Sequence, residues 1–176
     1  MNDERELIEA AKRDRAAFTP LYDCHAERIF AYAWRETGDE AVAEDVTAAV
    51  FEYALRNIGR YEQRGVPFSA WLYRIARSEI AGHYRRRKWL TPWQPKLERI
   101  SVDPQIEQQL QQQFALRRVH AGLMRLSNRD QEIVRLHFHE QLTHSEIGVV
   151  LNCSTRNVAV RLHRAIQRLK REVNDG

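Results

Sequence analysis

The side chains in this sequence that are best suited to chemistry form two clusters of cations, and both clusters are suited to binding a polyanion. Residues 74–88 hold six Lys or Arg against one acidic residue, Glu79, and four of the six are consecutive. Residues 152–176 hold six Lys or Arg against two Asp or Glu. Cationic side chains of this kind neutralise phosphates, while polar neighbours can read bases. A basic run alone is equally consistent with a solvated helix face. The choice between polyanion binding and a solvated face therefore depends on the elements around the two clusters.

No residues for catalysis, and none for a metal or cofactor, accompany these clusters. Asp45 has no partner base, nucleophile or Gly-rich phosphate loop near it. His137, His139 and His144 have no Cys or paired carboxylate beside them, and side chains two residues apart on a helix point to different sides. The sequence therefore predicts a protein that is not an enzyme and that binds neither a metal nor a cofactor.

The net charge of +4 is unevenly distributed over the 176 residues. Residues 1–60 hold 8 Lys or Arg and 13 Asp or Glu, a net charge of 8 − 13 = −5, which indicates a basic protein partner besides the polyanion. No apolar run reaches the roughly 18 residues of a membrane span, and the charged N-terminus lacks a signal-peptide pattern. A cytoplasmic location without membrane contact is expected. Cys24 and Cys153 are expected to be buried, reduced thiols.

Helical periodicity runs through residues 1–89, which are predicted to form a four-helix domain. Its helices are expected at about 4–16, 18–35, 40–58 and 68–89, with Trp34 and Trp71 in the core. The last helix, Phe68 to Trp89, has apolar residues at spacings of three and four, and Ser69 is suited to cap its start. Its first part is expected to be buried, and its basic end is expected to meet a polyanion.

Residues 90–112 lose this periodicity and are interrupted by three prolines, so they are predicted to form a linker. Residues 113–176 are predicted to form a second helical domain. Ser127 and Thr143 each precede an acidic residue by three positions, which is typical of a capping box at a helix start. Ser154 is expected to cap a final helix that ends at about Val173.

The last two of these helices, joined by a short turn, are typical of a helix-turn-helix motif. The second helix of such a motif presents its first residues to base edges in the major groove. Those residues here are Thr155, Arg156, Asn157, Ala159 and Val160. Phosphate contacts are expected from Ser154, Arg161 and Arg164. The alternative is a plain helical hairpin without DNA contact, and the net charge of residues 152–176 favours DNA.

The whole chain resembles a bacterial RNA polymerase sigma factor of the sigma-70 family, in its extracytoplasmic-function (ECF) group. The resemblance is carried by RIFAYAWRETGDEAVAEDV, by FSAWLYRIAR with RRRK behind it, and by LSNRDQEIVRLHFHEQLTHSEIGVVLNCS followed by NVAVRLHRAIQRL. It implies an all-α fold of two small helical domains joined by a flexible linker. Sigma region 2 would occupy residues 1–89, the linker 90–112 and sigma region 4 residues 113–176.

The resemblance also implies which partners the chain binds and where it binds them. Such a factor binds core RNA polymerase, directs it to promoter DNA and initiates transcription, often in a stress or envelope response under an anti-sigma factor. The core polymerase surface would include Glu44, Asp45, Val46 and Phe51. The surface for the −10 element would include Tyr61, Phe68, Ser69, Arg74, Arg77, Ser78, His83, Arg85, Arg86, Arg87 and Lys88. The −35 element would meet the eight residues named above for the helix-turn-helix.

Four positions depart from the family pattern: Ala48 and Ala49 in the polymerase-binding helix, and Ser78 and Gly82 in the −10 helix. The competing hypothesis is a stand-alone helix-turn-helix regulator that acts without core polymerase. That hypothesis leaves the acidic first third and the FSAWLYRIAR helix without a function, so a sigma factor is the stronger interpretation.

Overall fold

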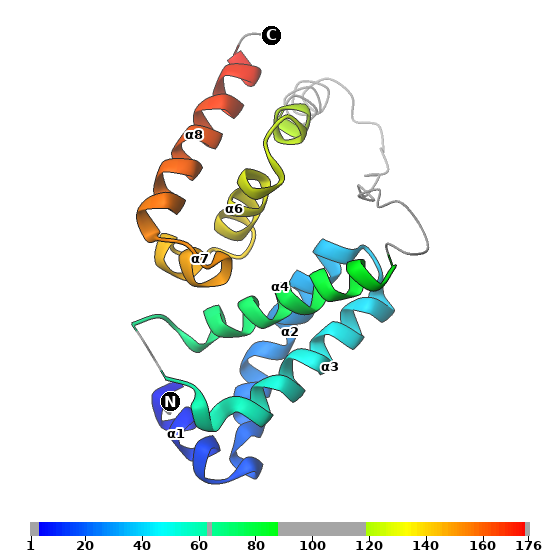
Figure 1. Cartoon of the computed structure of the whole chain (residues 1–176), viewed down its shortest axis with the longest axis vertical. Coiled ribbons are helices and arrows are strands. Elements are labelled where there is room, and N and C mark those ends of the chain that lie inside the picture. Colours follow the sequence, from blue (N-terminus) through cyan, green and yellow to red (C-terminus); the bar gives the residue numbers. More distant parts are fainter. Residues whose placement is uncertain (1–3, 63–64, 88–118, 175–176) are drawn as a thin grey trace, which may run out of the picture. The chain divides into compact units, whose positions relative to one another are not determined.

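The computed structural model describes residues 4–62, 65–87 and 119–174, and within these ranges the chain is helical without any strand (Figure 1). The all-α prediction is therefore confirmed. The chain divides into two compact units, Met1–Lys96 (unit 1) and Leu97–Gly176 (unit 2). The predicted linker over residues 90–112 lies outside the described residues. Over the ranges described, none of the helices combines the length and apolar character needed to cross a bilayer.

Unit 1 contains the four predicted helices and two short 3-10 turns. In chain order these are α1 (Glu4–Arg13), η1 (Arg15–Phe18), α2 (Thr19–Thr37), α3 (Glu40–Asn57), η2 (Ile58–Arg60) and α4 (Phe68–Arg87). Helix α1 ends three residues earlier than predicted, because the Asp14 carboxylate accepts a hydrogen bond from Ala16 N at 2.9 Å and starts η1 instead. Helices α2, α3 and α4 pack pairwise, and α1 packs on α2 and η2.

The chain reverses between α2 and α3 through the predicted break at Thr37-Gly38-Asp39. Gly38 has a φ of 64°, and its N–H donates to Trp34 O at 2.7 Å, which satisfies a carbonyl at the end of α2. The Asp39 carboxylate accepts from Val42 N at 3.2 Å and caps α3. Three consecutive residues thus end one helix and begin the next.

The predictions that Trp34 and the two cysteines are buried are wrong. Trp34 is 44% exposed, because it follows the buried Ala33 by one position and turns about 100° away from the core near the end of α2. Cys24 is exposed and Cys153 is half-buried, although both thiols are free as expected. The fully buried large side chains of unit 1 are instead Ile8, Leu21, Ile29, Val50, Phe68, Leu72 and Tyr73.

Unit 2 contains the three predicted helices α6 (Asn128–Phe138), α7 (His144–Leu151) and α8 (Thr155–Asn174), preceded by helical residues 119–124. Ser127 caps α6 by accepting from Asp130 N at 3.2 Å. Thr143 and Glu146 form the predicted capping box of α7, with Thr143 N donating to the glutamate at 2.6 Å. Ser154 Oγ accepts from Asn157 N at 3.2 Å at the start of α8. All three predicted helix starts are confirmed.

A tight turn joins α7 to α8. Asn152 lies in the left-handed region at φ 51°, and Cys153 N donates to Gly148 O at 2.9 Å. A Cβ atom added to Gly148 would lie 2.8 Å from the backbone oxygen of Cys153, closer than a carbon can approach. The turn therefore requires a residue without a side chain at position 148, and this close approach fixes α7 against the start of α8.

Candidate nucleic-acid interface

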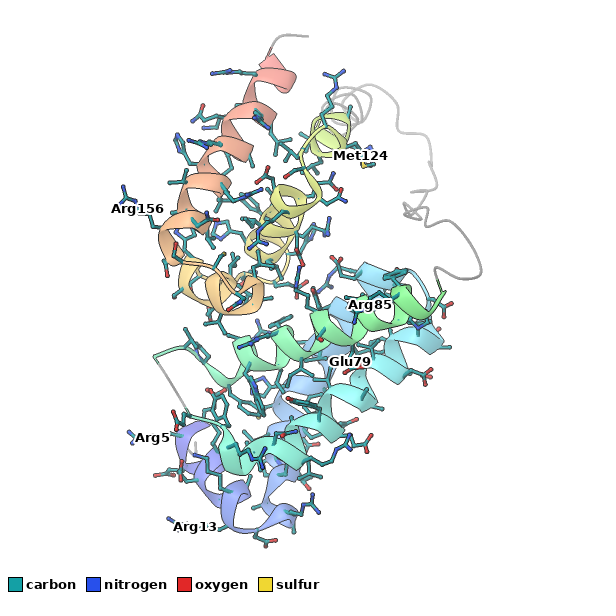
Figure 2. The ribbon with its side chains drawn as sticks, viewed as in Figure 1. Arg5, Arg13, Glu79, Arg85, Met124 and Arg156 are labelled. Carbon is teal, nitrogen blue, oxygen red and sulfur yellow. The ribbon has the colours of Figure 1, made fainter. Side chains whose placement is uncertain are left out.

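Helix α8 has one buried side and one exposed side. Val158 and Leu162 are buried in unit 2 at 0% and 4% exposure. The residues predicted to meet base edges lie on the other side or at the helix start. Thr155, Arg156, Asn157 and Val160 are exposed, and Ala159 is half-buried. Figure 2 shows the Arg156 side chain projecting outward from the first turn of α8. A guanidinium, an amide and an apolar side chain are thus available together, which suits base readout in the major groove.

Arg161 of α8 is engaged within unit 2. Its Nε donates to Asp130 Oδ1 at 2.8 Å, and its Nη2 lies 3.3 Å from Ser127 Oγ. The Asp130 side chain is only 16% exposed, so the pair is shielded from solvent on that side. Asp130 was predicted only as part of a helix cap, and its second function as the ion-pair partner of Arg161 was missed. The pair fixes α8 on α6. Arg164, the other arginine predicted to contact phosphate, is exposed.

The residue before Asp130 anchors the other helix of the motif. Arg129 Nη2 donates to Leu151 O at 3.1 Å, which satisfies a carbonyl at the end of α7. Two consecutive side chains of α6 therefore hold α7 and α8 in their relative orientation. The exposed start of α8 is positioned by these contacts and by the Gly148 turn.

Helix α4 also separates buried from exposed side chains. Phe68, Leu72, Ile75, Ala76 and Ile80 are buried, which confirms the predicted apolar stripe. Arg74, Ser78 and Arg85 are exposed, and Ser69, Arg77 and His83 are half-buried. Figure 2 labels Glu79 and Arg85 on this helix. Arg86 and Arg87 continue α4, but their side chains, and all of Lys88, lie outside what the structure describes. The structure therefore offers a row of polar and cationic side chains along α4.

Tyr61 and Phe68 belong to an aromatic cluster at the start of α4, together with Tyr53 and Trp71. The ring of Phe68 lies 5.2 Å from that of Tyr61 and 5.4 Å from that of Trp71, and Tyr61 lies 4.8 Å from Trp71. Phe68 is 0% exposed and Tyr61 is 8% exposed. These two rings therefore contact other rings rather than solvent. The cluster reaches solvent through Trp71, which was predicted to lie in the core but is half-buried, and through Tyr53, which is 43% exposed and was not singled out from the sequence.

Burial raises the pKa of Tyr61 from 10.0 to about 12, and the negative charge of Glu4 adds to the shift. The unfolded chain ionises this phenol near 10, so between the two values the folded state holds the proton more tightly. The stability that this tighter proton binding contributes to the folded state is fully present below pH 10, and it is lost as the pH rises through 12. We expect the free energy of unfolding of the wild type to fall more steeply from pH 9.5 to 11.5 than that of Tyr61→Phe, as measured by urea denaturation. Equal slopes for the two proteins would contradict the burial of this phenol.

The outward face of α3 is acidic. Glu44 and Asp45 are exposed, whereas Val46 and Phe51 are buried at 4% and 5% exposure. The Phe51 ring packs on Tyr22 at 4.8 Å. The four residues predicted to bind polymerase therefore divide into two carboxylates that a basic partner can reach and two apolar side chains that support the helix from within.

Within residues 4–62, 65–87 and 119–174, no three His, Cys, Asp or Glu side chains gather so that they could hold a metal ion. The candidate surfaces consist of cations and hydroxyls on α4 of unit 1, cations and an amide on α8 of unit 2, and carboxylates on α3 of unit 1. Such surfaces bind macromolecules through charge and hydrogen bonds.

Comparison with known proteins places a sigma-factor region in each unit. A family model described as Sigma-70 region 2 matches residues 21–90, and one described as Sigma-70, region 4 matches residues 122–171. The ECF RNA polymerase sigma factor SigD of Mycobacterium bovis is 33% identical over 173 residues, which are 95% of this chain and 82% of that protein. The chain belongs to the sigma-70 family. The resemblance stated from the sequence is thereby confirmed.

Other relatives agree with this assignment. The ECF RNA polymerase sigma factor BldN of Streptomyces coelicolor is 30% identical over 97% of this chain, which spans 66% of that protein. SigW of Bacillus subtilis, also an ECF sigma factor, is 24% identical over 98% of this chain and 97% of its own length. The solved structure of CnrH in complex with the cytosolic domain of CnrY has a similar fold, with a TM-score of 0.62, 24% identity and coverage of 95% and 94% of the two chains. The chain is thus an ECF sigma factor, a transcription initiation factor rather than an enzyme.

Proposed function

We propose that this sigma factor docks on core RNA polymerase through α3 and reads a promoter at two places, the −10 element with α4 and the −35 element with α8. Residues 1–89 would act as region 2, residues 90–112 as the linker and residues 113–176 as region 4, in the cytoplasm. The proposal rests on family membership together with the separation of acidic and basic side chains on the exposed faces of these three helices.

The observation that carries the proposal is the exposed start of α8. Arg156 and Asn157 are free to form bidentate hydrogen bonds with guanine and adenine, and Val160 at 41% exposure can pack on a thymine methyl group. Arg164 is placed to contact phosphate one to two turns later. Ser154 and Arg161, by contrast, use their polar atoms to cap α8 and to bind Asp130, so we assign them to positioning the helix.

On α4 we assign the −10 contacts to the exposed and half-buried polar residues Ser69, Arg74, Arg77, Ser78, His83 and Arg85, with Arg86, Arg87 and Lys88 continuing the charged run. Tyr61 and Phe68 support this surface from beneath through the aromatic cluster. On α3 we assign polymerase contact to Glu44 and Asp45, with Val46 and Phe51 holding the helix in place.

An anti-sigma factor belongs to the same proposal as a further partner. The sigma factor RpoE from Bartonella quintana, solved in complex with the anti-sigma factor NepR, has the same fold at 18% identity and a TM-score of 0.60. The acidic and basic faces that would meet polymerase and DNA are the surfaces that such a partner would have to cover.

The −35 assignment is tested by Arg156→Ala and Asn157→Ala, with Arg168→Ala as the matched control. Arg168 is exposed on the same helix but lies about three turns from its start. A bidentate base contact is worth about 1–3 kcal/mol, so each of the first two variants should lower run-off transcription from a promoter fragment by about 5- to 150-fold. The control should stay within about two-fold of the wild type, and all three should bind core polymerase normally.

Two results would contradict the −35 assignment. In one, the Arg156 and Asn157 variants transcribe as well as Arg168→Ala. In the other, they lose core polymerase binding, which would place the start of α8 on the polymerase.

A further inference from the structure

A carboxylate from the first helix lies at the start of α4. Glu4 Oε2 accepts a hydrogen bond from Phe68 N at 3.2 Å, although the two residues are 64 positions apart. The other carboxylate oxygen, Oε1, lies 3.2 Å from His25 Nε2 of α2. Glu4 therefore joins α1, α2 and α4 at one point, which is the point where the chain enters the helix assigned above to the −10 element.

The geometry at this point is that of a helix cap supplied from a distance. The first N–H groups of an α-helix have no partner within the helix, and a negative charge beside them is stabilising. At the start of α4, Ala70 N donates to Pro67 O at 3.1 Å within the chain, whereas Phe68 N donates to Glu4. Glu4 thus supplies both an acceptor and a charge to the first turn of α4.

Helix α1 is held firmly enough to position this carboxylate. Its inward side chains Ile8 and Ala11 are 2% and 1% exposed. A helix of ten residues is marginal by itself, so α1 owes its structure to this packing on the rest of unit 1. The His25 ring lies 5.7 Å from the Phe68 ring, so the residue that binds Glu4 from α2 also packs on the side chain that begins α4.

We propose that Glu4 is a positioning residue for promoter opening, because its carboxylate fixes the start of α4 and thereby orients residues 65–69, which lead into the −10 surface. This inference rests on the proposed function of α4. The region 2 model matches residues 21–90, so the proposal adds α1 to the part of unit 1 that functions in promoter opening.

The test compares Glu4→Ala and Glu4→Gln with Glu9→Ala in the full-length chain. Glu9 lies on the same helix and forms an exposed pair with Lys12 at 2.7 Å, so its loss is a matched control. Each variant is assayed with core polymerase on a promoter duplex and on the same promoter with the −10 region already unpaired. Binding to core polymerase is measured separately.

We expect Glu4→Ala to slow run-off transcription from the duplex about ten-fold, a change of about 1.4 kcal/mol. On the unpaired template it should stay within about two-fold of the wild type, because opening is no longer required. Glu4→Gln keeps an acceptor for Phe68 N without the charge, so its loss on the duplex should be smaller than that of Glu4→Ala. Glu9→Ala should match the wild type on both templates, and core binding should be unchanged in all variants.

Three results would overturn the proposal: Glu4→Ala equal to Glu9→Ala on the duplex, an equal loss on both templates, or a loss of core binding. The last two would show general damage to unit 1 rather than a function in opening. Failure of the proposed function would look different, because the wild type itself would then give no transcript with core polymerase on any promoter fragment.

Discussion

Phe68→Ala is expected to lower the free energy of unfolding of unit 1 by about 3–5 kcal/mol, the range for large aromatic truncations in a core. Phe68 is fully buried and its ring contacts those of Tyr61, Trp71 and His25. Because small domains are stable by only about 5–15 kcal/mol, this loss removes a large share of the total. Urea denaturation followed by tryptophan fluorescence measures it, since Trp34 and Trp71 lie in this unit.

Two further variants separate a buried support from a DNA contact. Tyr53→Ala truncates an aromatic residue at the edge of the same cluster, where 43% of it is exposed, and should cost about 1 kcal/mol or less. Phe68→Leu keeps most of the apolar volume and should retain transcription to within a few-fold. If Phe68→Leu were as stable as the wild type yet inactive on promoters, the ring would be stacking on a base, and the supporting function assigned to it here would be wrong.

Gly148→Ala is expected to destabilise unit 2 through a contact with the backbone. The added Cβ would lie 2.8 Å from Cys153 O, and overpacking of this kind typically costs about 1–3 kcal/mol. The higher helix propensity of alanine, worth about 1 kcal/mol, offsets only part of this cost. We expect a lower midpoint in urea and a loss of transcription from promoters that depend on the −35 element, because the turn orients the start of α8.

Gly59→Ala is the matched control, since a Cβ at Gly59 meets nothing within 4 Å. This variant should be as stable as the wild type or slightly more stable. Equal urea midpoints for Gly148→Ala and Gly59→Ala would show that the turn between α7 and α8 can open without cost, contrary to the close approach described above.

The features that the sequence predicted correctly are local ones. The starts of α6, α7 and α8 follow from Ser127, Thr143 and Ser154, because a hydroxyl side chain caps an N–H only two or three residues away. The buried side of α8 follows from apolar residues at spacings of three and four, and Val158, Leu162 and Ala165 are indeed buried. Because the second basic cluster lies on α8, the exposed cations of that helix could also be predicted.

The features that the sequence missed depend on contacts between distant residues. Glu4 and Phe68 are 64 positions apart, and Asp130 and Arg161 are 31 positions apart, so no local pattern links them. Arg161 was expected to bind phosphate because only its position on α8 was considered, not the carboxylate that α6 places beside it. Tyr61 was expected at the DNA surface because the resemblance to sigma factors placed it there, whereas the rings of Phe68 and Trp71 enclose it.

The central claim is that this chain directs core RNA polymerase to a promoter and does not act alone. The measurement that tests it most directly is run-off transcription from promoter fragments with core polymerase alone, with the chain alone and with both together. We expect a transcript of defined start only from the combination, and a yield lowered by at least about five-fold when Arg156→Ala replaces the wild type. Tight promoter binding by the chain without core polymerase, together with no stimulation of transcription on any fragment, would contradict the account.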